Sequence, residues 1–387
     1  MHMNRLIVIL PPLFKEIMKN IFLSAFFCVA IVASYAQDET PVYEFENSVD
    51  LSHTDTKNQC QTGTCWSFAT TSFLESELIR MGKGEHNLSE MFSVRMTYPK
   101  KAQMYVRMHG KHQFGPGSLC HDVINVLSED GCIPESVYSG RESEDVDYNH
   151  GQLDAVLKAT VEAVVKNGGG KYDYLGAVDG ILDAYIGEVP ETFEYEGKEY
   201  TPESFRDGMG LNADDYINFT SYTHHPFYEN FVLEIPDNFS QGQFMNVPLS
   251  DMISVIDNAL ENGFSVAWDA DVSERSFSFK NGVAIIPVKG TDKADMWKKV
   301  VDEKKVTQEM RQETFDNFTT TDDHLMHLIG RATDQNGTIY YMIKNSWGDD
   351  NPYGGIQYIS QEYVKLKTVG ILVHKDGVPK AVKKLIK

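Results

Sequence analysis

The spacing of apolar residues predicts a helix over residues 65–81. Apolar residues fall on related faces at three- and four-residue steps, namely Ala69, Phe73, Leu74, Leu78 and Met81. Thr64 stands where its hydroxyl can cap the first turn. The pattern of apolar residues also predicts helices over residues 119–129, 151–166 and 249–262.

Two strand-like runs near the C-terminus flank a turn. Residues 324–332 are rich in apolar side chains, and residues 338–344 are rich in β-branched and aromatic ones. An Asn-Gly pair at 336–337 is a strong hairpin signal. In a hairpin centred near residue 335, the numbers of facing residues add to about 670. The numbers of His324 and Asn345 add to 669, so the turn places these two residues opposite each other.

Between these regions, the sequence pattern predicts two more strands and an insertion. The strands are expected at 266–271 and 283–288. Residues 141–245 combine a helix with short aromatic-rich stretches and a run of three glycines at 168–170. The glycines lack the strand-before, helix-after context of a phosphate loop, so we interpret them as a flexible connector.

The N-terminus has the features of an export signal. Lysines precede an apolar stretch over residues 21–33, which is short for a bilayer span, and small residues follow it up to Ala36. We therefore expect residues 1–36 to be a cleaved signal peptide and residues 37–387 to be an exported mature domain. No later segment is apolar enough to cross a membrane.

Composition narrows the classes of partner. The formal net charge is −21, which argues against nucleic acid as a partner because phosphate binding needs clustered Lys and Arg. With 42% apolar residues, the chain can bury a sizeable core. We interpret the acidity as that of a soluble, solvated surface.

Four cysteines remain after the expected cleavage, which is few for a disulfide framework in a chain of this length. They are Cys60, Cys65, Cys120 and Cys132. The last two lie near the two ends of one predicted helix, roughly 18 Å apart, too far for a disulfide. No bridge is evident from the sequence.

Cys65 is a candidate nucleophile because it occupies the first turn of a predicted helix. The N–H groups and dipole at a helix N-terminus favour a thiolate there. Trp66 would cover such a site, and the amide of Gln59, six residues upstream, could donate to an oxyanion. Taken alone, Cys65 fits a buried free cysteine on an apolar helix better.

The other histidines are weaker candidates for chemistry. His327 is three residues from His324, and an odd offset on a strand points to the opposite face, so we expect it to be structural. His224 and His225 have no partners at metal-ligand spacing in the sequence, so no metal site is expected.

Three blocks of sequence resemble the motifs of papain-like cysteine peptidases, in the family's order. The blocks are Asn58-Gln59, Gly63 and Cys65-Trp66-Ser67-Phe68 for the nucleophile, Asp323-His324 and Gly330 for the histidine strand, and Lys344-Asn345-Ser346-Trp347-Gly348 for the asparagine. The resemblance implies Cys65 as nucleophile, His324 as base and Asn345 as the residue that orients the base. Gln59 would complete the oxyanion hole, and Trp347 would shield the Asn–His bond from water.

Within that class, the chain is most similar to the bleomycin hydrolase and bacterial aminopeptidase C branch. The matching segments are Ile181–Gly187, Tyr200-Thr201-Pro202, Asp214–Ile217, Asn246-Val247-Pro248 and Val378-Pro379. The pair Gly117-Ser118 stands where the branch has an edge that binds substrate backbone. Together with Trp66, Asp323 and Trp347, this pair makes up the expected substrate-binding set.

The resemblance implies an α+β papain-like fold with two lobes. One lobe is helical around Cys65, and the other is β-barrel-like and carries His324 and Asn345. A largely helical insertion spans about 141–245. The expected substrates are peptides and the expected cofactors are none. Members of the branch form closed hexamers, which leaves a homo-oligomer as one expectation.

The family resemblance and the C-terminal residues lead to different predictions about exopeptidase activity. In the branch, a terminal carboxylate at the end of a C-terminal arm binds the free amine of the substrate. Here the basic stretch 375–387 suits a short surface helix better than such an arm. We therefore expect acetylated peptides to be cut within about tenfold of free ones. The alternatives are an endopeptidase, a transamidase, or an inactive peptide-binding protein on the same scaffold.

Overall fold

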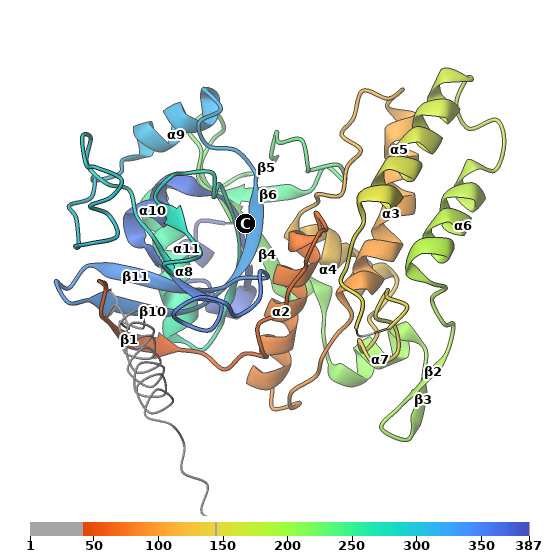
Figure 1. The fold of residues 1–387 in the computed structure, drawn as a ribbon, viewed down its shortest axis with the longest axis horizontal. Coiled ribbons are helices and arrows are strands. Elements are labelled where there is room, and N and C mark those ends of the chain that lie inside the picture. Colours follow the sequence, from red (N-terminus) through yellow and green to blue (C-terminus); the bar gives the residue numbers. More distant parts are fainter. Residues whose placement is uncertain (1–41, 144, 387) are drawn as a thin grey trace, which may run out of the picture. The chain divides into compact units, whose positions relative to one another are not determined.

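The computed structural model describes residues 42–143 and 145–386, and Tyr43–Lys387 forms one compact unit (Figure 1). The expected signal peptide, residues 1–36, and its cleavage site at Ala36 lie outside the described residues. In the described part of the chain, no helix combines the length and the apolar character needed to cross a bilayer.

One half of this unit is helical. Its elements are α2 (Cys65–Arg80), α3 (Glu90–Arg107), α4 (Cys120–Glu129), α5 (Gly151–Lys166), α6 (Tyr174–Ile186) and α7 (Pro202–Met209), with a small hairpin of β2 (Phe193–Tyr195) and β3 (Lys198–Tyr200). Helices α3, α5 and α6 lie side by side at the edge away from the sheet (Figure 1). Their apolar faces pack into one hydrophobic core together with α2 and α4.

The other half is a mixed sheet. Its strands are β1 (Phe45–Asp50), β4 (Tyr216–Thr220), β5 (Asn230–Val232), β6 (Gln243–Asn246), β7 (Val266–Ala270), β8 (Phe277–Ser278), β9 (Val283–Ala284), β10 (His324–Asp334), β11 (Ile339–Lys344), β12 (Ile356–Ser360) and β13 (Thr368–His374). In the described residues these eleven strands run in the order β5-β6-β4-β13-β7-β10-β11-β12-β9-β8, with β1 also paired to β10. The α+β papain-like expectation is confirmed, but the path is open at β5 and β8, so the lobe is not a closed barrel.

Four helices and two short 3-10 turns complete the part of the chain that the structure describes. They are α8 (Leu249–Glu261), α9 (Gln308–Asp316), α10 (Gln361–Lys367), α11 (Lys380–Lys383), η1 (Ala213–Asp215) and η2 (Lys375–Gly377). A second hydrophobic core joins α8 and α10 to the central strands. Val382 of α11 is buried in this core, as expected for a short docked helix near the C-terminus.

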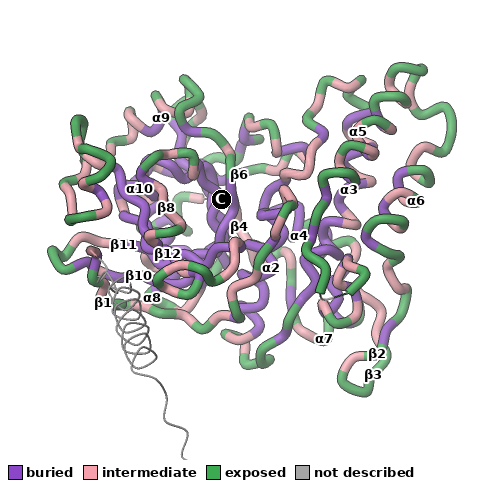
Figure 2. Tube along the Cα trace, viewed as in Figure 1, coloured by how far each residue is buried: buried purple, intermediate pink, exposed green. Residues whose placement is uncertain are grey.

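Helix α2 is the central element, because it packs against α3 and α4 on one side and against β7 and β10 on the other (Figure 1). Its side chains are buried on nearly every face, as the tube coloured by burial shows (Figure 2). This position places its first residue, Cys65, where the helical half meets the sheet.

Several predicted boundaries are confirmed to within one or two residues, namely those of α2, α4, α5, α8 and β7. The predicted cap is wrong: the Thr64 side chain makes no capping bond, and its hydroxyl lies 2.7 Å from that of Thr62. The region 141–245 is helical only in its first part, because β4, β5 and most of β6 fall within it and join the main sheet.

The hairpin of β10 and β11 forms, but its register differs from the prediction. Its pairs run from His327 opposite Lys344 to Thr333 opposite Ile339, with an irregularity between Leu328 and Gly330. The turn is centred one residue later than expected. His324 lies beyond the paired part of this hairpin, and its strand partner is Ala270 of β7.

Candidate active site

Cys65 is the first residue of α2 and is only 8% exposed. Burial raises the pKa of its thiol to about 12, although the backbone N–H of Leu325 partly opposes this. The sequence predicted a lowered value from the helix N-terminus, so here the loss of solvent outweighs the helix. A thiolate at Cys65 therefore needs a neighbouring base that takes its proton.

His324 and Asn345 are joined by a hydrogen bond. The distance from His324 Nε2 to Asn345 Oδ1 is 2.8 Å. The backbone N–H of Ser346 donates to the same oxygen at 2.7 Å, and Asn345 Nδ2 donates to Gln357 Oε1 at 2.6 Å. These bonds fix which end of the amide faces the imidazole. Nε2 must then carry the hydrogen, which leaves the lone pair of a neutral ring on Nδ1.

Trp347 covers the imidazole. The two rings stack with centroids 4.5 Å apart and an interplanar angle of 23°. Phe277 and Phe279 meet the indole edge-on, at 6.1 and 5.6 Å. This aromatic wall lies over His324, one partner of the Asn–His bond that Trp347 is expected to shield. Burial lowers the pKa of His324 to about 4, while the bond to Asn345 opposes the shift.

Gln59 links the nucleophile loop to the asparagine block. Its Oε1 accepts from Ser346 Oγ at 2.6 Å, and its backbone N–H donates to the Ser346 carbonyl at 2.9 Å. Its Nε2 donates to the Thr62 carbonyl at 2.8 Å, which engages one of two hydrogens on that nitrogen. Gln59 is thus fixed beside the segment that leads into Cys65.

The segment around Gly117 is tied down from behind. Lys101 Nζ donates to the carbonyls of Gly115 and Gly117, and Trp66 Nε1 donates to the Pro116 carbonyl at 2.9 Å. Trp66 is buried, so it supports this loop from below instead of covering the site. Within the edge that is expected to bind substrate backbone, the Gly117 carbonyl therefore accepts from Lys101.

Ser118 and Asp323 also differ from the expected substrate-binding set. Ser118 is buried, and its hydroxyl donates to Asp122 Oδ2 at 2.7 Å, so it helps to begin α4. Asp323 is exposed, and Thr321 Oγ1 donates to its carboxylate at 2.7 Å. Neither side chain contacts the imidazole of His324 through a hydrogen bond within the described residues.

His327 lies away from this group. It is fully buried, and its Nδ1 is 2.9 Å from the hydroxyl of Ser72 on α2. Its ring meets that of Phe73 edge-on. Burial holds its pKa well below the usual range. This environment fits the predicted structural role, although its Nε2 has no partner among the described residues.

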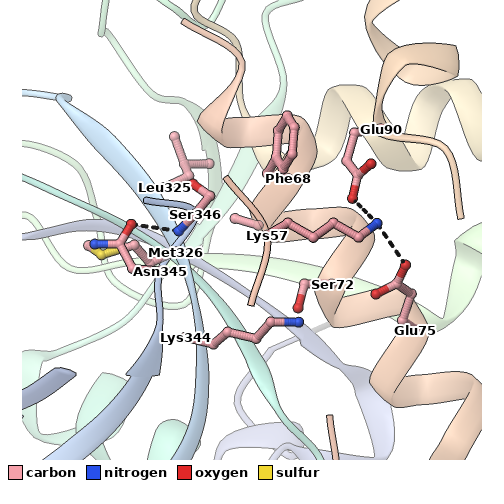
Figure 3. Close-up of a pocket in the computed structure, with 11 residues that line it drawn as sticks. Lys57, Phe68, Ser72, Glu75, Glu90, Leu325, Met326, Lys344, Asn345 and Ser346 are labelled. Carbon is pink, nitrogen blue, oxygen red and sulfur yellow. Dashed lines mark hydrogen bonds and ion pairs between the residues drawn. The ribbon is translucent and has the colours of Figure 1, made fainter. Parts of the chain in front are cut away.

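A buried ionic cluster and Asn345 line the same pocket (Figure 3). Lys57 Nζ is 2.5 Å from Glu90, 3.5 Å from Glu75 and 3.1 Å from Glu135. A cavity of about 10 Å³, enough for roughly one water, lies beside this cluster. The cluster joins the lead-in strand to α2 and α3.

The same cluster extends to the strand that carries Asn345. Lys344 Nζ donates to Thr54 Oγ1 at 2.8 Å, and the Thr54 hydroxyl donates to Glu75 at 2.5 Å. The residue before Asn345 is therefore anchored to α2. Burial lowers the pKa of Lys344 to about 8.

Sequence reasoning missed three carboxylates near Cys65. Asp237, Asp269 and Asp322 add to the effect of burial on the pKa of the Cys65 thiol. Asp269 interrupts an otherwise apolar strand, and that interruption was the available signal. Asp237 had no local signal, because it comes from a loop far away in the sequence.

The structure also groups His224 and His225 with Glu234, which the sequence did not indicate. Their candidate ligand atoms lie within 4.8 Å of one another. The Nε2 atoms lie 3.2 and 2.7 Å from the carboxylate of Glu234. The hydrogen bonds from the two rings lower the pKa of Glu234 against the opposing effect of burial.

The C-terminal part of the sequence matches a known protein family. Residues 171–387, more than half of the chain, match the model of the Peptidase C1-like family. That stretch contains His324 and Asn345 but not Cys65.

Relatives extend the similarity over most of the chain. Aminopeptidase G of Lactobacillus delbrueckii subsp. lactis is 22% identical, over 88% of this chain and 85% of its own. Aminopeptidase C of Streptococcus thermophilus is 23% identical, over 87% and 85%. The crystal structure of PepW from Lactobacillus rhamnosis HN001 superposes with a TM-score of 0.70 at 18% identity, over 88% of this chain and 84% of that one. This chain therefore belongs to the Peptidase C1-like family and is a cysteine-type peptidase with the papain-like fold.

Proposed function

We propose that the chain hydrolyses peptide bonds through a thioester formed on Cys65, with His324 as base and Asn345 as its positioning residue. The observation that carries the proposal is the 2.8 Å bond from His324 Nε2 to Asn345 Oδ1 beneath Trp347. This bond leaves Nδ1 as the basic atom of a ring whose strand packs against α2. The nucleophile at the start of α2 lies against Leu325, the residue next to His324.

The reaction follows from these positions. The Cys65 proton moves to His324 Nδ1 as the sulfur attacks the substrate carbonyl carbon, and the carbonyl oxygen becomes an oxyanion. The C–N bond then breaks, and the leaving amine takes the proton from Nδ1. Water next gives a proton to Nδ1 and attacks the thioester, which releases the acid and restores the thiol.

Gln59 and the backbone N–H of Cys65 are the proposed donors to the oxyanion. Gln59 Nε2 keeps one hydrogen beyond its bond to Thr62, and its Oε1 is fixed by Ser346. A donor held in place in this way needs no reorganisation when the negative charge develops. Removal of one such donor typically lowers kcat by about 10²–10³.

We extend the proposal to an aminopeptidase activity, because the curated relatives that cover most of the chain are named aminopeptidases. Such an enzyme must distinguish a free amine from a blocked one. Rates on a peptide with a free and with an acetylated N-terminus measure this property directly.

Alkylation of the cysteines with iodoacetamide near neutral pH tests the thiol and its base together. Cys60 is more exposed than Cys65, so exposure alone favours Cys60. If His324 takes the Cys65 proton, Cys65 reacts first. In His324→Ala the thiol keeps its burial-raised pKa, and Cys65 should react more slowly than Cys60.

The same protein, assayed with an activated ester, should release a burst of product equal to the amount of enzyme. Cys65→Ala should show neither burst nor turnover. If Cys60 reacts first in the unmodified chain and no burst is seen, the proposed function is wrong and the inactive peptide-binding alternative stands.

We also propose that the protein is exported after cleavage near Ala36. The support is the apolar stretch at residues 21–33 with its preceding lysines and following small residues. Assembly into a homo-oligomer stays a proposal from the resemblance alone.

A further inference from the structure

Three carboxylates from separate segments surround the candidate nucleophile. Asp269 is on β7, Asp322 stands two residues before His324, and Asp237 lies in the loop after β5. Burial is the main cause of the raised pKa of the Cys65 thiol, and all three carboxylates add to it. They are therefore close enough to act on a group bound beside the sulfur.

Their positions define two sides of one subsite. Asp269 is the cross-strand partner of Leu325, whose N–H faces the Cys65 thiol. The carboxylate of Asp237 lies directly over Gly117, where any side chain would collide with it. Gln113 Nε2 donates to the other oxygen of Asp237 at 3.1 Å. The carboxylates thus extend from Gly117 to the end of β7 and the start of β10.

The subsite lacks a cation bonded to its carboxyl groups. Asp269 is 3% exposed, and within residues 42–143 and 145–386 the group that meets its carboxyl is the carboxyl of Asp322; burial and then Asp322 hold the pKa of Asp269 well above its usual range. Asp322 Oδ2 and the hydroxyl of Tyr222 are also buried, and in the same residues neither has a hydrogen-bond partner. Two carboxyl groups side by side can share one proton, and a cationic donor from outside the chain that replaces this proton would pair with both.

Two cations lie nearby, and both donate to backbone carbonyls. Arg311 stacks on Tyr222 at 4.6 Å and donates to the carbonyls of Ser221 and Lys365. The Lys101 ammonium donates to the carbonyls of Gly115 and Gly117. Burial and the charge of Asp237 raise the pKa of Asp322 to about 7, and Lys101 opposes them as the last of the causes. Lys101 therefore forms no ion pair with these carboxylates among the described residues.

We propose that Asp237, Asp269 and Asp322 form a subsite that binds a positively charged group of the peptide, N-terminal to the scissile bond. This proposal rests on the proposed peptidase function and on the Gly117 edge as the side that receives those residues. An ammonium or guanidinium group provides both the charge and the N–H donors that the carboxyl oxygens lack. Its source is either the α-amine of the substrate or a Lys or Arg side chain.

Three fluorogenic dipeptide amides separate the two sources. Acetyl-norleucyl-alanyl amide carries no charge, acetyl-lysyl-alanyl amide carries a charged side chain, and norleucyl-alanyl amide carries a free α-amine. We expect kcat/KM for one charged substrate to exceed that for the neutral one by at least about tenfold. If the free amine is the preferred group, the ratio would exceed the tenfold limit between free and acetylated peptides that the basic C-terminal stretch predicts. Equal rates on all three substrates would overturn the subsite.

Two variants test the carboxylates themselves. Asp269→Asn and Asp322→Asn should each lower the charged-to-neutral ratio by about tenfold. Glu194→Gln removes one exposed charge on the β2–β3 hairpin and should leave the ratio unchanged. Thermal unfolding identifies a variant that fails to fold. In that case the charged-to-neutral ratio of the other Asn variant tests the subsite. An unchanged ratio in a folded Asn variant contradicts the proposal.

A failure of the proposed function gives a different result. If the unmodified chain cleaves none of the three substrates, calorimetric titration with the same peptides measures the subsite without catalysis. Tighter binding of a charged peptide than of the neutral one, lost in Asp269→Asn, supports the subsite even then. Equal binding of all three peptides overturns it.

Discussion

His324 and His327 stand three residues apart on one strand and have different partners. His324 bonds to Asn345 and stacks on Trp347, whereas His327 bonds to Ser72 on α2. Both rings are buried, and burial lowers the pKa of each, so the pKa does not distinguish them. The neighbouring groups do, because His324 precedes Leu325, whose backbone N–H faces the Cys65 thiol, whereas His327 lies against Ser72 and Phe73.

We predict that His324→Ala lowers kcat by about 10²–10⁴, the usual contribution of a general base, or by more if the ion pair is lost as well. His327→Ala should mainly lower the free energy of unfolding, since it removes a buried ring and leaves Ser72 without its partner. Steady-state kinetics and urea unfolding of both variants check this. The reverse pattern would make His327 the base.

Asp322 gives a stability prediction with a definite sign. Burial, with Asp237 and Asp323 adding to it, raises the pKa of Asp322 to about 7, while Asp269 and Lys101 oppose the shift. The folded state therefore binds this proton more tightly than the unfolded state. Its contribution to stability is present below about pH 4 and is lost as the pH rises through about 7.

Asp322→Asn should remove that dependence. We expect the variant to gain stability over the unmodified chain as the pH rises from 5 to 8, which thermal unfolding across this range would measure. Glu194→Gln, at an exposed position, should follow the unmodified chain. Parallel curves for all three proteins would show that Asp322 has an ordinary pKa in the folded state.

At the scale of elements, α2 is held by charges as well as by apolar packing. Glu75 on α2 and Glu90 on α3 both lie against Lys57 of the lead-in segment, and Lys344 is joined to Glu75 through Thr54. The positions of the nucleophile helix and of the asparagine strand therefore depend on one buried network (Figure 3).

We predict that Lys57→Met lowers the free energy of unfolding by about 3–5 kcal/mol, since it leaves buried carboxylates without their cation. Lys299→Met is the control, because Lys299 forms an exposed ion pair with Asp295. Its cost should stay below about 1 kcal/mol. Urea unfolding of both variants gives the comparison, and similar losses would show that the buried network adds no stability of its own.

At the scale of the whole molecule, the expected export defines where the mature chain begins. The native protein should start at Gln37, and N-terminal mass spectrometry of protein purified from its source checks this. Ala36→Leu should block cleavage, because the signal peptidase requires a small residue there. A native protein that retains residues 18–36 would contradict the cleaved signal.

Much of the candidate site follows from local sequence. The segment that begins at Cys65 has helical spacing throughout, and the Asn-Gly turn brings the His324 strand back toward Asn345. These features depend on neighbours within about 20 residues, which is why the spacing of side chains and the chemistry of one turn were enough to predict them. Helix α3 was missed, because Pro99 and several charged residues obscure its pattern.

What the tertiary structure decided concerns burial and groups that are distant in sequence. Thr64 offers no capping bond and the Cys65 thiol is desolvated, so the local expectation of a lowered pKa is reversed. Asp237 and Asp269 meet beside that thiol only because β5 and β7 enter one sheet. Solvent exclusion and charge proximity depend on which segments pack together, whereas helical spacing and turn type are already set by the order of residues.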